Sequence, residues 1–115
     1  MQNLPFITSK DERRILYEYI EDETFKAAKV VVALSEIPIG DHYHLKKEEV
    51  FFLLYGSFKE LHIGKEIDYN VDAPCKIKIE RGVYHKFVLE IGSVLLCVTT
   101  AKFDINDEIN DAKMV

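Results

Sequence analysis

Short apolar runs, either alternating with polar residues or continuous, follow one another along most of the chain. Segment 14–20 places Ile15, Tyr17 and Tyr19 on one parity, and segment 29–34 is a β-branched run typical of a buried strand. Further segments with strand character are 42–44, 49–55, 58–63, 75–79, 83–90 and 93–100. The pattern therefore predicts a series of short strands with almost no amphipathic helix.

Turn-forming residues separate these segments. The breaks contain Pro38 with Gly40, Gly56, Gly64, Ala73 with Pro74, Gly82 and Gly92. Many short strands joined by turns favour an all-β sandwich or barrel over a parallel sheet with crossover helices. The acidic segment 104–113, with Ile105 and Ile109 four residues apart, predicts either one or two helical turns or a frayed tail.

Composition narrows the class of protein. The chain has 115 residues, 48% of them hydrophobic and 30% charged, which predicts one domain spanning residues 1–115. Its net charge of −5 disfavours nucleic acid as a partner. The longest apolar run, 50–55, has six residues, whereas a membrane-spanning helix needs about 20, so we expect no membrane association.

The first residues and the cysteines bear on the compartment. Charged residues at 10–14 precede any apolar stretch long enough for a secretion signal, so we expect a cytoplasmic protein. Cys75 and Cys97 are not part of a CxxC motif. We therefore expect two free buried thiols rather than a disulfide.

The histidines indicate a candidate site. On a strand, His42 and His44 project from the same face and can converge on one point. A carboxylate follows at Glu48 or Glu49, and periodicity alone does not choose between them, because both faces of segment 49–55 are apolar.

A further imidazole, His85, belongs to a later strand that barrel closure can bring beside the first pair. Three neutral imidazoles and one carboxylate suit a divalent transition metal, and an octahedral ion would keep two positions open for water or substrate. The alternative is a set of hydrogen-bonded barrel histidines with no metal. His62, beside the turn at Gly64, is expected to be an ordinary exposed histidine.

These residues resemble the motifs of the cupin superfamily. His42-Tyr43-His44, four residues, Glu49, six residues and Gly56 match the first cupin motif, and Gly82 with His85 matches part of the second. The resemblance implies a single-domain jelly-roll barrel. It also implies that His42, His44, Glu49 and His85 bind a divalent metal, which would be Mn, Fe, Ni, Co or Zn, and it selects Glu49 over Glu48.

A finer resemblance is to small cupins of polysaccharide and nucleotide-sugar biosynthesis, which often show HYHxxKxExF. Here that pattern is met by residues 42–51, including Lys47. The segments around Asp11 and Phe103 are similar to the sugar ketoisomerase-like branch, although Ile39 stands where that branch usually has arginine. Those ketoisomerases are thought to use histidines as acid/base groups without metal, whereas Glu49 and His85 favour a metal-binding cupin.

Three hypotheses about function follow. The first is an isomerase or epimerase for a sugar-like hydroxycarbonyl substrate, nucleotide-linked sugars included, with Tyr55, Tyr84 or an unligated histidine moving the proton. The second is an Fe(II)-dependent dioxygenase, which needs the same ligands and open positions. The third is a non-catalytic barrel that binds a small molecule.

Two further expectations concern the surface of the protein. If Glu49 points inward, Val50, Phe52 and Leu54 point outward, and segment 30–34 is apolar on both parities. We therefore expect a homodimer, the alternative being cover from a second sheet or the amino-terminal strand. Basic side chains near His85 or on one strand face could hold an anionic substrate, although such residues are more often solvated: Lys76, Lys78, Arg81 and Lys86.

Overall fold

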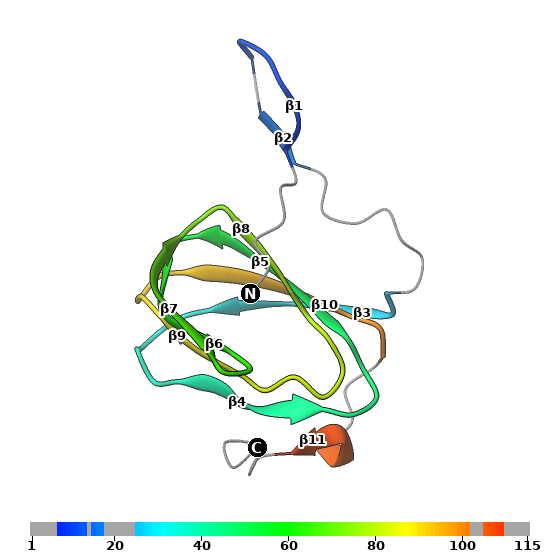
Figure 1. Ribbon diagram of the computed structural model, residues 1–115. Helices are drawn as coiled ribbons and strands as arrows, with labels where there is room; N and C mark the ends of the chain where they lie inside the picture. The colour runs from blue at the N-terminus through cyan, green and yellow to red at the C-terminus, as the bar shows by residue number, and fades with distance from the viewer. Residues whose placement is uncertain (1–6, 14, 18–24, 102–104, 110–115) are drawn as a thin grey trace.

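The computed structural model describes residues 7–13, 15–17, 25–101 and 105–109. Two antiparallel sheets face one another in a barrel (Figure 1). The first has the order β3 (Ala27–Val32), β10 (Val94–Thr99), β5 (Glu49–Tyr55) and β8 (Cys75–Ile79). The second has the order β11 (Glu108–Ile109), β4 (Ile39–His44), β9 (His85–Leu89), β6 (Ser57–Ile63) and β7 (Glu66–Asp72). Strands β1 (Ile7–Lys10) and β2 (Ile15–Tyr17) form a two-stranded sheet of their own.

Strand β5 sets which side chains face the barrel interior. It lies between β10 and β8, with Phe51 opposite Cys97 on one side and Ile77 on the other. Phe51 and Leu53 are buried in the main core, whereas Phe52 belongs to a second cluster on the outer face. Glu49 shares the parity of Phe51, so its carboxylate points into the barrel, as the motif predicted.

The outer face of this sheet is covered in part by the chain itself. Val50 is 7% exposed and Phe52 is fully buried, packed with Val98, Phe25 and Leu96. The chain's own residues therefore shield these side chains from water, and no second subunit is needed for it. The expectation that a partner must cover them does not hold at Val50 and Phe52.

The strands expected from sequence are present in the described part of the chain, with ends that differ by a few residues. Residues 14 and 18–20 of the first predicted strand lie outside the described residues. The expectation that segment 29–34 is buried was wrong, because β3 is an edge strand on which Val30 and Val32 are more than half exposed. Strand β1 was not anticipated, and neither was β7, with the sequence EIDYNVD. Strand β7 is an edge strand that pairs with β6 alone and is exposed at most positions, so it needs no apolar alternation.

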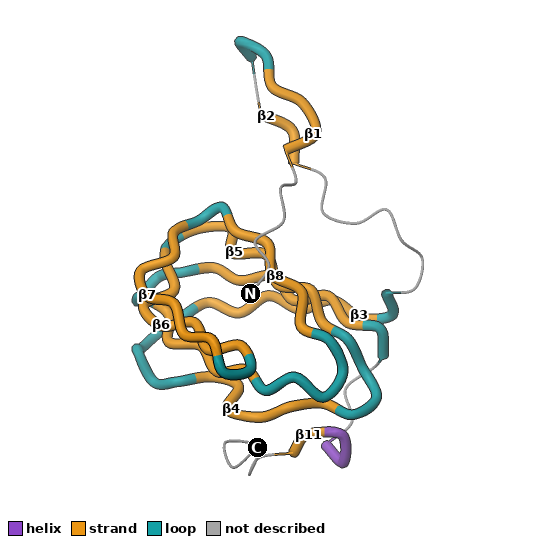
Figure 2. The backbone as a smooth tube through the Cα atoms, in the orientation of Figure 1, coloured by secondary structure: helices purple, strands orange, loops and turns teal. Residues whose placement is uncertain are grey.

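The described part of the carboxyl-terminal segment, residues 105–109, has regular secondary structure. A 3-10 turn, η1 (Ile105–Asp107), leads into β11, which pairs with β4 at His44 and Tyr43 (Figure 2). Residues 104 and 110–113 of the predicted helix or tail lie outside the described residues. In the part of the chain that is described, no helix has the length and apolar character needed to cross a membrane.

Candidate metal centre

The site begins with an irregularity in β4. The pairing of β4 with β9 shifts between Gly40 and His42, and both Gly40 (φ +82°) and Asp41 (φ +60°) have left-handed backbone conformations. A Cβ atom on Gly40 would lie 2.9 Å from the His85 carbonyl oxygen, so glycine allows β4 to approach β9 closely. The Tyr84 hydroxyl donates a hydrogen bond of 2.5 Å to Asp41 Oδ1 and holds this bulge.

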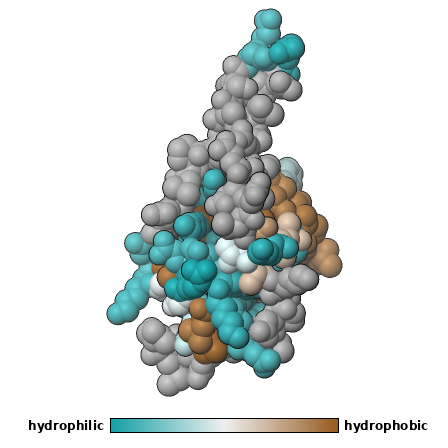
Figure 3. Space-filling model, turned by 90° about the vertical axis from the view of Figure 1, so that its right-hand side faces the viewer, coloured by the Kyte–Doolittle hydropathy of each residue, from teal (hydrophilic) through white to brown (hydrophobic). Residues whose placement is uncertain are grey.

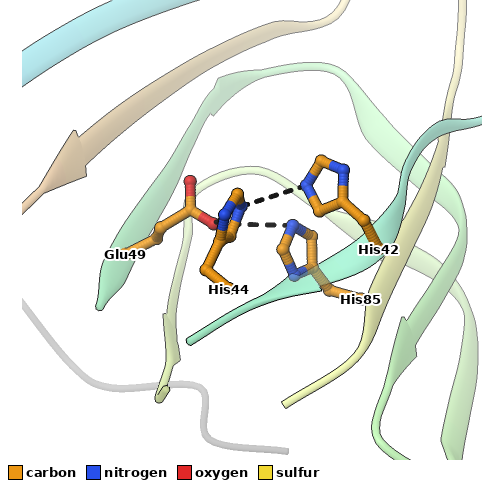
Figure 4. Close-up of side chains that lie close together, drawn as sticks. All are labelled: His42, His44, Glu49 and His85. Atoms are coloured by element: carbon orange, nitrogen blue, oxygen red, sulfur yellow. Dashed lines mark hydrogen bonds and ion pairs between the residues drawn. The ribbon is translucent and has the colours of Figure 1, made fainter. Parts of the chain in front are cut away.

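Four side chains from three strands converge inside the barrel (Figure 4). His42 and His44 come from β4, Glu49 from β5 and His85 from β9, and one ligand atom of each lies within 4.8 Å of the others. His44 Nε2 is 3.1 Å from His42 Nε2 and 3.1 Å from Glu49 Oε1, while His85 Nε2 is 3.5 Å from the same oxygen. The structure thus brings together all four residues that the motifs selected.

These spacings fit a divalent transition metal. Ligand atoms about 2.1 Å from an ion are about 3.0 Å apart at right angles, near the separations of 3.1, 3.1 and 3.5 Å in the cluster. Glu49 Oε1 is buried, and in the described part of the chain no group approaches it in hydrogen-bond geometry. A buried carboxylate oxygen facing three imidazole nitrogens lacks a partner that a cation would supply.

The protonation states also suit a cation. Burial opposes the charge of Glu49, but the His44 imidazole, with Nε2 3.1 Å from Oε1, and the positive charge of a protonated His85 outweigh burial and lower the pKa of Glu49 to about 2. Burial lowers the pKa of His85 to about 4, and burial with the neighbouring His44 lowers that of His42. At neutral pH the cluster is therefore one carboxylate beside neutral His42 and His85, the protonation states that bind metal.

Two side chains lie behind the ligands. Cys97 Sγ donates a hydrogen bond of 3.3 Å to Glu49 Oε2, which leaves Oε1 facing the histidines. Asp107 Oδ2 lies 3.8 Å from His44 Nδ1, while Asp107 Oδ1 accepts hydrogen bonds from the backbone of Leu45 and Lys46. His44 Nδ1 has no hydrogen-bond partner among the described residues, so Asp107 acts on the ring through its charge.

The cluster opens onto a cavity of about 160 Å³ between the sheets. Its walls include the four clustered residues, apolar side chains such as Phe51 and Phe87, and three further charged residues, Lys29, Lys47 and Glu108. The cavity therefore combines an apolar wall with a few polar groups, as small-molecule sites do.

Neither tyrosine predicted to move a proton lines this cavity. Tyr55 is 69% exposed at the end of β5, and Tyr84 bonds to Asp41, with burial raising the pKa of its phenol to about 12. His62 lies outside the cluster, with Nε2 3.0 Å from Glu60 Oε1. Sequence reasoning missed Asp107 and Glu108, which belong to an acidic segment with no motif of its own.

Of the other sequence expectations near the site, the one about the cysteines is confirmed and the one about the basic residues is not. Both cysteines are buried and free, as predicted. Arg81 and Lys78 contact Glu48 on the outside of the barrel, at 3.3 Å and 3.7 Å. Among the residues expected to attract an anion, none lines the cavity: Lys76, Lys78, Arg81 and Lys86.

Comparison with solved structures identifies the fold. A 3,4-ketoisomerase from Helicobacter canadensis matches 98% of this chain and 92% of its own length, with 21% identity and a TM-score of 0.81. A TDP-fucose 3,4-ketoisomerase from Campylobacter jejuni matches 98% and 90%, with 23% identity and a TM-score of 0.80. The chain has a cupin fold.

A more distant cupin gives the same result. The RmlC epimerase from Mycobacterium tuberculosis matches 85% of this chain and 62% of its own length, with 14% identity and a TM-score of 0.70. No protein-family model matches the chain, and no curated protein matches its sequence. The likeness therefore establishes the architecture predicted from the motifs, an all-β cupin barrel.

The shifted pKa values predict acid sensitivity of the metal-free protein. The pKa of His85 falls from 6.5 in a free side chain to about 4 in the fold, so the unfolded chain binds the proton more tightly. The free energy of unfolding should therefore decrease as the pH falls from about 6.5 to 4, by on the order of 3 kcal/mol. Glu49, with its pKa of about 2, adds a decrease below pH 4.5.

Urea unfolding at several pH values measures this dependence. The decrease between pH 6.5 and 4 should become smaller in His85→Gln and stay the same in His62→Gln. An unfolding free energy that is constant over this range in the unsubstituted protein would contradict the prediction.

Proposed function

We propose that the protein is a metal-dependent isomerase or epimerase acting on a sugar-like hydroxycarbonyl substrate. The observation that carries the proposal is the convergence of three imidazole Nε2 atoms and Glu49 Oε1 in a cavity. The matched structures, described as sugar 3,4-ketoisomerases and an epimerase, support the choice of reaction class.

The residues His42, His44, Glu49 and His85 would hold the ion, and the mixed nitrogen and oxygen set accepts Mn, Fe, Ni, Co or Zn. A bound divalent ion would polarise the substrate carbonyl and stabilise the negative charge that develops when the adjacent carbon loses its proton. Phe51 and Phe87 exclude water from one side of the cavity, which strengthens that electrostatic effect.

Glu108 is the residue we assign to the proton transfer. It is half-buried on β11, it lines the cavity, and its charge acts on His42. A carboxylate at the cavity wall that is not part of the ligand cluster can remove a proton from the substrate and return it. This assignment replaces Tyr55 and Tyr84, which the cavity does not include.

Deuterium exchange tests the proposed reaction. The protein, loaded in turn with each divalent metal, is incubated in deuterated water with sugar phosphates and with nucleotide-linked ketosugars, and exchange beside the carbonyl is followed by NMR. The expected result is exchange that disappears after chelation of the metal. Exchange that survives chelation would indicate metal-free acid/base catalysis, and oxygen uptake dependent on Fe(II) would indicate a dioxygenase. Ligand binding without either would indicate a non-catalytic cupin.

We also propose that the protein is a cytoplasmic homodimer. β3 is an edge strand, and its outward residues Val30 and Val32 are 59% and 55% exposed, followed by Leu34 at 87% and Ile37 at 73%. Figure 3 shows a face on which apolar surface gathers beside polar surface. An exposed apolar edge strand favours pairing with a second copy, and free thiols are usual in the cytoplasm.

Light scattering at micromolar concentration measures this association. The unsubstituted protein should have the mass of a dimer, and Val32→Glu should shift it toward the monomer, because a charge would be buried in the interface. Ile67→Glu, at a position 47% exposed on β7, is the matched control and should leave the mass unchanged. A monomeric mass for the unsubstituted protein would exclude the dimer.

A further inference from the structure

Two lysines enter the cavity from segments that are far apart in sequence. Lys29 is on β3, on the same parity as Val31, and both line the cavity. Lys47 lies in the loop between β4 and β5, only 4% exposed. The two side chains also border a smaller adjoining hollow of about 50 Å³, together with Cys97 and Thr99. They therefore mark the place where the two hollows meet.

The burial of Lys47 requires a physical explanation. A lysine with so little exposed surface is uncommon unless its ammonium is paired; the Lys47 nitrogen itself is not among the fully buried atoms, so it can reach the cavity. Among the described residues, no carboxylate lies within 4.0 Å of the Lys47 ammonium, and no recorded hydrogen bond reaches it. The charge of Lys47 lowers the pKa of Glu49, but by less than His44 and His85 do. The fold thus keeps a cation at the cavity wall without a close partner.

The charges of the cavity favour an anionic group on the ligand. Its charged residues are Lys29 and Lys47 on one hand and Glu49 and Glu108 on the other, so they balance when the four-residue cluster is empty. A divalent cation held by the cluster would leave a charge of about two positive units to be neutralised. An anionic substituent on the ligand supplies that charge.

We propose that Lys29 and Lys47 form an anion subsite that binds a carboxylate or phosphate group of the substrate, next to the His42, His44, Glu49 and His85 cluster. The substrate class narrows accordingly, from a neutral hydroxycarbonyl compound to one with an acidic group close to the reacting carbon. The reaction assignment rests on the proposed function, whereas the anion subsite does not depend on turnover. A lysine ammonium group binds a carboxylate and a phosphate alike, as a point charge. The experiment therefore uses a separate probe for each of the two groups.

Calorimetric titration of the protein, both metal-loaded and metal-free, tests the subsite apart from catalysis. The probes are inorganic phosphate and glucuronate, with glucose as the neutral comparison. Phosphate or glucuronate should bind measurably at about 10 mM or below, and glucose should not. Lys47→Met should weaken binding roughly tenfold to a hundredfold, Lys29→Met should also weaken it, and the turn variant Lys65→Met should leave it unchanged. Tighter binding of phosphate would identify a phosphorylated substrate, and tighter binding of glucuronate a sugar acid.

A stability measurement separates ligand recognition from a structural role for Lys47. If the ammonium is held for a ligand, Lys47→Met removes no close partner and leaves the melting temperature of the ligand-free protein unchanged or higher. If Lys47 serves only to neutralise Glu49, the same change lowers it. A lower melting temperature, or anion affinities within twofold of the unsubstituted protein in both Lys47→Met and Lys29→Met, would overturn the proposal. Lys29 is exposed, so Lys29→Met keeps the test valid if Lys47→Met does not fold.

Discussion

Glu49→Gln is expected to abolish stoichiometric metal binding and, with it, substrate exchange. The substitution keeps the size of the side chain but removes the only carboxylate of the four-residue cluster, whose pKa of about 2 keeps it charged. A neutral amide is a much poorer ligand for a divalent transition metal, so we expect affinity to fall by at least about 100-fold. Elemental analysis and metal titration of the purified variant measure the effect.

His62→Gln is the matched control for this experiment. His62 is half-buried on the neighbouring strand β6 but lies outside the cluster, so its replacement should leave metal content unchanged. If Glu49→Gln retained metal at the level of the unsubstituted protein, the cluster would not be the metal centre. The barrel should stay folded in either case, because Glu49→Gln removes a buried charge without leaving a cavity.

Glu108→Gln is expected to reduce substrate exchange by roughly 10² to 10⁴ while metal content stays the same. Glu108 lines the cavity but does not belong to the ligand cluster, so the amide removes the proton acceptor and leaves the metal site intact. Rates of deuterium incorporation, measured at saturating substrate, report the proton transfer directly.

Three further variants serve as comparisons for Glu108→Gln. Tyr55→Phe and Tyr84→Phe test the tyrosines favoured by sequence alone, and neither should lower the rate as much, because neither lines the cavity. Glu80→Gln replaces an exposed carboxylate in a turn and controls for the loss of charge. A rate in Glu108→Gln equal to that of Glu80→Gln would move the proton transfer to another group.

The two carboxylates show how burial separates roles that look alike in sequence. Glu49 is 3% exposed, shares a hydrogen bond with Cys97 and faces three histidines, so it is held in one position as a ligand. Glu108 is half-buried on a strand of two residues at the sheet edge, where it can meet the substrate and solvent. Only the first of them stands in a recognisable motif.

Local patterns were enough to predict the strands and the ligand pair. The period of two places His42 and His44 on one face, because successive side chains of a strand point to opposite sides. Strand β5 was predicted with its observed bounds, since it is apolar from Val50 to its end. By contrast, β7 was missed because an exposed edge strand needs no apolar face, and polar residues such as Glu66 and Asp68 look like a loop.

Register and packing decided what periodicity left open. Both faces of β5 are apolar, since Phe51 enters the core and Phe52 the outer cluster, so parity could not distinguish Glu48 from Glu49 without the cupin motif. The structure places Glu48 outside the barrel beside Arg81 and Glu49 inside it.

The sequence by itself determined an all-β chain with a histidine pair, a carboxylate and a later histidine at cupin spacing. Only the tertiary structure decided which distant groups complete the cavity, namely Asp107 behind His44, Glu108 at the wall, and Lys29 beside Lys47. The reason is physical: a strand pattern depends on neighbours two residues apart. Contact across a barrel depends instead on pairing between distant segments such as β11 and β4. Beside that pairing, the hydrogen bonds from Leu45 and Lys46 to Asp107 join residues 62 and 61 positions apart.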